Sequence, residues 1–326
     1  MKRKVIRQGQ NTLTVSLPSG WAKKNGIKQG LEVDVSEQGR HLVLSSDNPG
    51  RPRVAIDISG ITKPIVIWRY LLSAYRAGYD EILVTGIEPS NKELYTPFTF
   101  NTLAYIKPGE FSTMSPIETI SACVNRLIGV EIIEHKEGTC LIKDLNETSY
   151  KEFDSALRRI FLLLKREAES IIHGLEGRKE ELKSIHIIDT NIDRFEDFCL
   201  RVLNKKGYHD FKKTPTIYNT IFLLEMVGDE FKKIATHIIG MKGRHSANIK
   251  KLFRAQYEQL ERFYSTFYSF SKGRVKEIYE ENERYQKLMS DTYHSLDENQ
   301  KGLAGHFKNI GSHILSLTEL AIDLNV

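Results

Sequence analysis

The second half of the chain is a succession of long segments in which apolar residues recur every three or four positions. One such stripe starts at Ile185 and continues through Ile192 and Cys199. This spacing places the apolar side chains on one face of a helix and is typical of helices packed in a bundle. Breaks at glycine and proline separate six predicted helices, over residues 149–174, 180–206, 215–241, 246–271, 273–297 and 299–325.

The six predicted helices divide into two copies of a three-helix unit. Residues 224–231 of the third helix correspond to residues 307–314 of the sixth, at an offset of 83 residues. Gly228 and Gly311 occupy the same position in the two segments. Because glycine within a helix costs about 1 kcal/mol relative to alanine, this pair indicates a close approach of two helices. We therefore expect an all-α domain over residues 148–326, with repeats over 148–242 and 246–326.

The first 47 residues have a different pattern, with short alternating segments that are typical of β-strands. Alternation runs through residues 12–17, 31–35 and 41–45, and Pro18 and Gly26 bound one short helix. The predicted order over residues 1–47 is strand, strand, helix, strand, strand. A unit of this size can barely bury a core by itself. We therefore expect two copies of the chain to dimerise through shared strands.

A predicted α/β module of residues 54–147 follows a linker at 48–56. It contains strands at 54–59 and 80–86, helices at 65–78 and 115–129, and a hairpin that turns at Lys136–Gly138. The module has neither a glycine-rich phosphate loop nor a nucleophile elbow. We interpret it as a spacer or a regulatory domain.

Composition limits the class of protein further. Hydrophobic residues make up 40% of the chain and charged residues 27%, as in a globular protein. No stretch of 18 uncharged apolar residues and no signal-peptide core is present, so we expect no membrane insertion. The three cysteines (Cys123, Cys140 and Cys199) are too far apart to indicate a disulfide framework or a thiolate metal site. We expect a cytoplasmic protein.

Acidic residues lie one position beyond the apolar stripes of the second and third predicted helices. They are Asp189, Asp193 and Glu196 on the second helix, and Glu225 and Asp229 on the third, followed by Lys232. Spacings of three and four residues make each set a ridge on one helix face. If the two helices are antiparallel neighbours, the ridges converge, and such carboxylates suit a divalent cation, iron or zinc. The alternative is a solvated face that Arg194, Lys232 or water neutralises. The second repeat has Lys308 and Ser312 in place of the third-helix acids.

Basic residues are concentrated near the beginning of the chain, where residues 1–47 hold eight basic and four acidic residues. Lys2, Arg3, Lys4 and Arg7 precede or begin the first strand, and Lys23 and Lys24 lie on the short helix. Lysine and arginine neutralise DNA phosphates, and arginine also binds guanine edges. These six residues are therefore candidate DNA contacts. The alternative is an ordinary solubilising terminus.

The run KRKVIRQGQNTLTVSLPSGWAKKNGIKQGLEVDV, with RHLVLS after it, resembles the AbrB/MazE/SpoVT family of swapped-hairpin DNA-binding domains. The run LLEMVGDEFKKIA, and IDTNIDRFEDFCLRVL before it, resemble PhoU, the phosphate-uptake regulator. The combination resembles archaeal PhoU-like regulators that carry an AbrB-type N-terminus. The first resemblance implies a dimer that binds DNA through its basic residues. The second implies a sensor or interaction bundle, with metal ligands at Glu225 and Asp229 and also at Asp189 and Asp193.

These observations predict a multidomain α+β protein with a swapped-hairpin β domain, an α/β module and a PhoU-like pair of three-helix bundles. The expected function is that of a homodimeric, DNA-binding transcriptional regulator of phosphate uptake or phosphate homeostasis, without enzymatic activity. The alternative is a modulator that does not bind DNA and acts on a phosphate transporter, or on signalling proteins, through protein contacts. A metal-dependent hydrolase is a third hypothesis, but the sequence offers no nucleophile or base for it.

Overall fold

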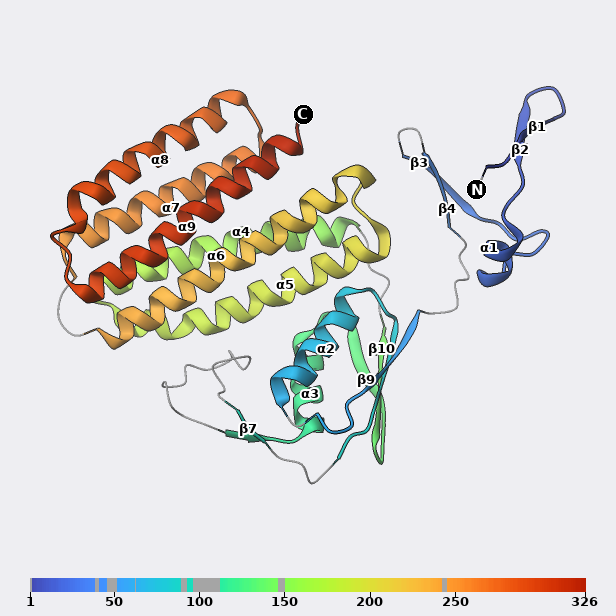
Figure 1. Ribbon diagram of the computed structural model, residues 1–326, viewed down its shortest axis with the longest axis horizontal. Coiled ribbons are helices and arrows are strands. Elements are labelled where there is room, and N and C mark those ends of the chain that lie inside the picture. The colour runs from blue at the N-terminus through green and yellow to red at the C-terminus, as the bar shows by residue number, and fades with distance from the viewer. Residues whose placement is uncertain are drawn as a thin grey trace. The chain divides into compact units, whose positions relative to one another are not determined.

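The computed structural model forms two compact units, divided between Pro52 and Arg53 (Figure 1). Unit 1 contains residues 1–52 and unit 2 contains residues 53–326. The structure describes residues 2–38, 41–45, 52–61, 63–88, 93–95, 112–145, 150–241 and 245–326.

Unit 1 has the predicted order of strands around one short helix. Its elements are β1 (Val5–Gln8), β2 (Thr12–Val15), α1 (Ser19–Lys24), β3 (Asp34–Gln38) and β4 (His41–Ser45). Strand β1 pairs with β2 and β3 pairs with β4, each pair antiparallel and forming a separate two-stranded sheet. The third strand begins at Asp34, later than predicted. Leu31 instead donates its N–H to the carbonyl of Lys28, and Gly30 has a φ of 85°, so a turn occupies the start of the predicted strand.

Unit 1 does not bury its own apolar side chains. Leu13 is 70% exposed and Val5 65%, and helix α1 contains no buried residue. The large apolar side chains of the unit that are exposed are Val5, Ile6, Leu13, Val15, Leu31, Val35, Leu42 and Val43. An ordinary folded unit would cover such a set, so the described part of unit 1 lacks a closed core.

Unit 2 begins with the α/β module, whose sheet has the order β5-β6-β10-β9. Its elements are β5 (Arg53–Asp57), α2 (Pro64–Arg76), β6 (Glu81–Thr85), β7 (Glu93–Tyr95), β8 (Ser112–Met114), α3 (Pro116–Arg126), β9 (Val130–Lys136) and β10 (Thr139–Asp144). Strands β5 and β6 are parallel, and the other pairs of this sheet are antiparallel. The prediction of both helices and of the hairpin is confirmed. The predicted linker was too long, because Arg53 already belongs to β5.

The sheet and the two helices of the module share one apolar core. Ile82 and Val84 of β6 and Cys140 of β10 pack with Leu71 of α2 and Ile120 of α3. Pro116 begins α3, and its N-cap Ser115 forms a capping box with Glu118, which fixes the start of this helix. The short pair β7–β8 was not predicted.

The remainder of unit 2 is helical (Figure 1). Its helices are α4 (Tyr150–Leu175), α5 (Ile185–Lys206), α6 (Thr214–Gly240), α7 (Ala247–Tyr268), α8 (Lys272–Tyr293) and α9 (Glu298–Asp323). The six predicted helices are confirmed, except that the turn Lys179–Ser184 before α5 is a 3-10 helix. A single apolar core contains residues from all six helices.

The helices pack as two triplets. Helices α4, α5 and α6 contact one another, as do α7, α8 and α9, and the triplets meet through α6 with α9 and α4 with α7. A methyl group added at Gly228 would lie 3.3 Å from Leu164, and one at Gly311 would lie 3.1 Å from Gln256. The prediction that both glycines mark a close helix approach is confirmed. Within the described ranges, no helix is long and apolar enough to cross a membrane.

Candidate functional site

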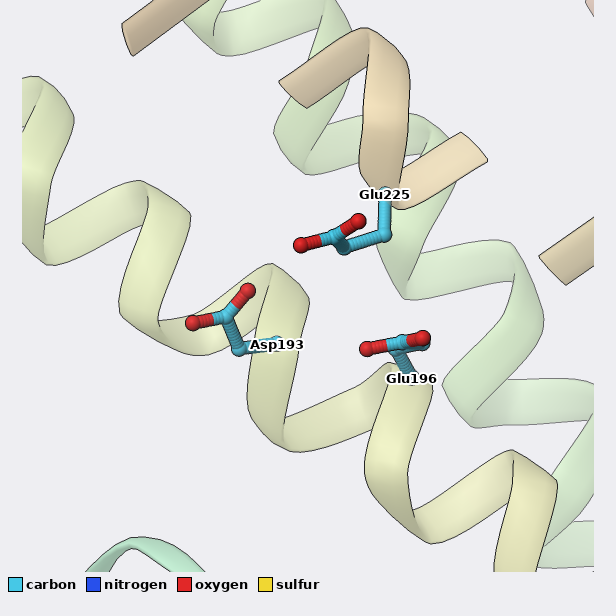
Figure 2. A group of neighbouring side chains, drawn as sticks. All are labelled: Asp193, Glu196 and Glu225. Atoms are coloured by element: carbon cyan, nitrogen blue, oxygen red, sulfur yellow. The ribbon is translucent and has the colours of Figure 1, made fainter. Parts of the chain in front are cut away.

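The acid group of unit 2 consists of Asp193 and Glu196 on α5 and Glu225 on α6. One carboxylate oxygen from each lies within 4.8 Å of the others, and Figure 2 shows the three side chains pointing toward one another. The apolar stripe of α5 causes this placement. Ile192 and Cys199 of the stripe are buried in the core, so Asp193 and Glu196 lie on the helix face next to the stripe. Asp193 is 9% exposed and Glu196 only 2%.

The other two candidate metal ligands have a different partner. Lys232 lies 2.9 Å from Asp189 and 2.7 Å from Asp229, so its ammonium group joins the two ridges. Five carboxylates were predicted to converge, and the structure brings together three of them in the acid group. The alternative of a solvated face is wrong in that Asp189, Asp193 and Glu196 are buried, but the neutralisation by Lys232 that it named is confirmed for Asp189.

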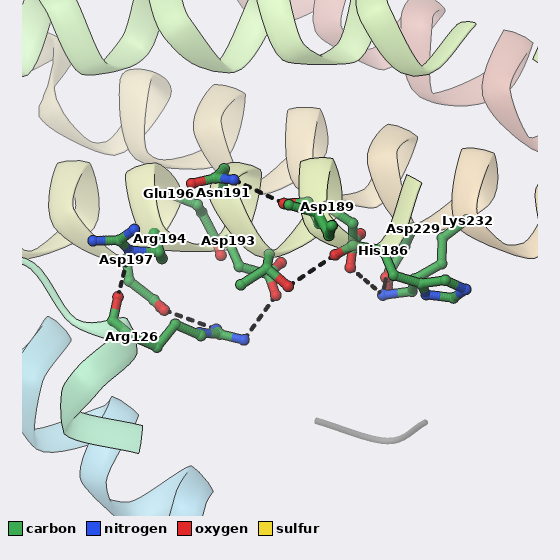
Figure 3. A network of polar contacts seen from close by, with 12 residues as sticks. Arg126, His186, Asp189, Asn191, Asp193, Arg194, Glu196, Asp197, Asp229 and Lys232 are labelled. Atoms are coloured by element: carbon green, nitrogen blue, oxygen red, sulfur yellow. Dashed lines mark hydrogen bonds and ion pairs between the residues drawn. The ribbon is translucent and has the colours of Figure 1, made fainter. Parts of the chain in front are cut away.

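Two arginines of the α/β module cover the acidic side of α5, and Figure 3 shows one of them, Arg126, beside Asp193 and Asp197. Arg126, in the last turn of α3, lies 2.8 Å from Asp193 and 3.1 Å from Asp197. Arg76, in the last turn of α2, lies 2.5 Å from Asp197 and 3.1 Å from Glu196. Neither arginine nor Asp197 was predicted from the sequence, because no local pattern indicates which surface a loop-connected module will cover.

The module also contacts α5 further along the helix, and there the basic residue lies on α5 and the acidic residues lie on the module. The guanidinium of Arg201, which is 1% exposed, donates to the carbonyls of Tyr75 and Tyr79 at 2.7 and 2.9 Å. It also lies 2.7 Å from Asp144 and 3.3 Å from Asp80. These contacts and those of Arg76 and Arg126 show that the module packs along one face of α5.

Glu167 of α4 is a further acidic residue that sequence analysis missed. It is fully buried beside Gly228, and neither of its carboxylate oxygens has a hydrogen-bond partner among the described residues. Burial raises its pKa well above the ordinary value, and the nearby Asp189 raises it further. Its place between Leu164 and Ile171 on an apolar stripe was the signal that could have identified it.

The carboxyl groups around the acid group have raised pKa values. Burial raises the pKa of Glu225 to about 8, and Asp229 and Asp193 add to the rise. Burial and the neighbouring Asp193 raise the pKa of Asp189 to about 7, although Lys232 opposes this. Burial raises the pKa of Glu196 well above its ordinary value, against the effect of Arg76. Closely spaced buried carboxylates resist ionisation unless a cation neutralises them.

The charge balance of this region therefore fits a bound cation. The wider acidic cluster contains seven carboxyl groups, those of Glu167, Asp189, Asp193, Glu196, Asp197, Glu225 and Asp229. Their described ion-pair partners are three cations, Arg76, Arg126 and Lys232. Oε1 of Glu196 is buried without a partner, and Glu225 forms no ion pair with a described residue. Oxygen donors of this kind suit Mg²⁺, Mn²⁺ or iron.

The candidate DNA contacts of unit 1 are all exposed. They are Lys2, Arg3, Lys4, Arg7, Lys23 and Lys24. None of the six forms an ion pair with a carboxylate in the described part of the chain, and Arg7 donates instead to the carbonyl of Gln10 at 2.7 Å. Lys2, Arg3 and Lys4 precede β1, and Arg7 lies within it. These charges remain available to a partner.

Comparison with known proteins finds similarity among solved structures. No protein-family model and no curated protein matches the chain. One similar solved structure is the phosphate transport system regulatory protein PhoU from Streptococcus pneumoniae, at 16% identity and a TM-score of 0.45. The match covers 54% of this chain and 94% of that chain. PhoU from Pseudomonas aeruginosa matches at 18% identity and a TM-score of 0.44, over 53% and 95% of the two chains. At TM-scores below 0.5, function has to be inferred from the contacts and charges of this chain.

Proposed function

We propose that the chain is a non-catalytic regulatory protein. Its helical body binds a divalent cation at the acid group, and unit 1 delivers the output by contacting DNA as a dimer. A cysteine nucleophile is absent, because burial raises the pKa of Cys140 to about 11 and also raises the pKa values of Cys123 and Cys199.

The exposed apolar surface of unit 1 is the observation that carries the proposal. Eight large apolar side chains are exposed in a unit of 52 residues, and burial of each would contribute about 1.5–3 kcal/mol. A second copy of the chain supplies an identical set of strands, and a twofold axis lets the two surfaces cover each other. Dimerisation also doubles the six cations, which gives the charge density that binding to DNA phosphates requires.

The test is the affinity of the full chain for mixed-sequence duplex DNA over a range of salt concentrations. We expect log K to fall linearly with log salt, and replacement of Lys2, Arg3, Lys4 and Arg7 by alanine to weaken binding at least tenfold. The salt slope should decrease by about one for each phosphate that the variant no longer neutralises. Four exposed lysines of the helical body form the matched control, changed to alanine together: Lys251, Lys272, Lys287 and Lys308. Binding that ignores salt, or that both variants weaken equally, contradicts the DNA assignment.

A second candidate function is modulation of a phosphate transporter through protein contacts, since the Streptococcus pneumoniae protein is a phosphate transport system regulatory protein. The apolar side chains of unit 1 favour it as well, because such a surface also suits a partner protein. A pull-down with purified transporter subunits, carried out beside the DNA titration, separates the two functions. Capture of the subunits without a DNA complex supports the second candidate.

A further inference from the structure

The acid group and the α/β module use the same carboxylates. Oδ2 of Asp193 lies 2.8 Å from Arg126, and Oε2 of Glu196 lies 3.1 Å from Arg76. Glu225, the third member, has no partner on the module among the described residues. We propose that a divalent cation at the acid group and the docking of Arg126 on α5 oppose each other, so that cation binding loosens this end of the module. The proposal rests on the cation site of the proposed function and adds a regulatory output to it.

Arg126 lies beside the acid group in a buried position, where a bound cation would repel it. The side chain of Arg126 is 10% exposed and that of Asp197 is fully buried, so the pair is shielded from solvent. The guanidinium also lies 5.4 Å from the ring centre of Trp68, which is 3% exposed. A divalent ion binds carboxylate oxygens at about 2.0–2.6 Å. An ion on Asp193 therefore lies close to the guanidinium, in a place where salt screens the repulsion weakly.

The acid group has a carboxylate oxygen that is free to bind a cation. Oε1 of Glu196 is buried without a hydrogen-bond partner, and the nearby Glu167 has both oxygens in the same condition. The side chain of Glu196 points toward Asp193 and Glu225 in Figure 2. An unpaired buried carboxylate oxygen is costly, and a cation at the acid group removes this cost, whereas Arg76 contacts only the other oxygen of Glu196. Glu225 and the unpaired Oε1 of Glu196 bind the ion first. The ion then competes with Arg126 for Asp193.

The docked module also has contacts on α5 that do not involve the acid group. Arg201 and Lys205 of α5 hold Asp80 and Asp144 of the module, and these pairs contain none of the candidate ligands. A cation therefore weakens the contact of Arg126 on α3 and that of Arg76 with Glu196, while the pairs of Arg201 and Lys205 persist. We expect a local release of α3 from α5 and not a separation of the module.

The opposition is measurable because linkage between two binding events is reciprocal. Mn²⁺ binding to the full chain, followed by isothermal titration calorimetry, should be at least fivefold tighter in Arg126→Gln than in the original chain. Arg69→Gln is the matched control: it removes an exposed arginine of the same module that has no ion pair among the described residues, and it should leave the affinity unchanged. Glu225→Gln should weaken binding at least tenfold. An unchanged or weaker affinity in Arg126→Gln overturns the proposal.

Hydrogen exchange of the unaltered chain tests docking without relying on a variant that could fail to fold. Saturating Mn²⁺ should accelerate amide exchange in α3 and leave exchange at Asp80 and Asp144, which pair with Arg201, unchanged. Glu225→Gln should abolish the acceleration. If Mn²⁺ does not bind at all, the cation site of the proposed function fails and the proposal fails with it. If Mn²⁺ binds and Glu225→Gln weakens it, but exchange in α3 is unchanged or slower, the opposition alone is wrong.

Discussion

Replacement of Arg201 by methionine should destabilise unit 2 strongly. Methionine keeps most of the aliphatic volume, but it removes the four polar contacts of the guanidinium to Tyr75, Tyr79, Asp80 and Asp144. Arg201 also lies 4.8 Å from the ring centre of Tyr75. The variant leaves Asp144, whose side chain is 6% exposed, with Lys205 as its described cationic neighbour at 3.1 Å.

The expected loss follows from the groups left behind. Removal of one partner of a buried ion pair costs about 3–5 kcal/mol, because the remaining charge stays out of water. The carbonyls of Tyr75 and Tyr79 lose a charged donor as well, and an unsatisfied buried acceptor costs about 1–3 kcal/mol. Relaxation and water entry offset part of this sum. We therefore expect the free energy of unfolding to fall by about 3–5 kcal/mol.

Equilibrium unfolding in urea, followed by the fluorescence of Trp68 in a Trp21→Phe background, measures this loss in the module itself. The chain has two tryptophans, so the background leaves Trp68 as the single reporter. Lys205→Met is the control, because the side chain of Lys205 is 21% exposed and Asp144 keeps Arg201 as a partner. The control should lose about 1 kcal/mol. A loss below about 1 kcal/mol in Arg201→Met, or equal losses in both variants, would show that the buried contacts of Arg201 do not stabilise the module.

Three further predictions concern the helical body. The pKa of Glu225 rises from its ordinary value of 4.5 to about 8 on folding, so the folded chain binds the extra proton and its stability should fall as pH rises between these values. In metal-free buffer the slope is at most about 1.4 kcal/mol per pH unit for this group, and urea unfolding of Glu225→Gln between pH 5.5 and 7.5 should show a shallower dependence. Glu167→Gln should leave the melting temperature unchanged or raise it, since the carboxyl has no described partner; a fall of 5 °C or more contradicts this. Gly228→Ala should lower the free energy of unfolding by about 1–3 kcal/mol, because its methyl group would lie 3.3 Å from Leu164; Gly305→Ala, at an open helix position, is the stabilising control.

Local patterns in the sequence predicted the elements of this fold well. The apolar stripes gave six helices whose ends lie within a few residues of the observed ones, because helix periodicity and glycine breaks are properties of short segments. The strand predicted from residue 31 begins only at Asp34, because this prediction also rested on the pattern of a short segment alone. Its alternation suits a strand, but the turn between Lys28 and Leu31 takes precedence.

The candidate site was predictable only in part. The acidic ridges of α5 and α6 could be read from spacing, and Asp193, Glu196 and Glu225 do meet. Arg126 could not be assigned, because it lies 67 residues before Asp193 and reaches it through tertiary packing of a separate module. Glu167 shows the opposite case, since an acidic residue within an apolar stripe is a local signal of a buried polar group.

The proposed output of the protein is DNA binding by paired copies of unit 1. Sequencing of genomic fragments recovered with the purified full chain tests this binding. A twofold dimer should enrich sites made of two inverted half-sites, and the enrichment should be lost when Lys2, Arg3, Lys4 and Arg7 are replaced by alanine. Recovery of no enriched sequence, or equal enrichment with the alanine variant, would contradict it.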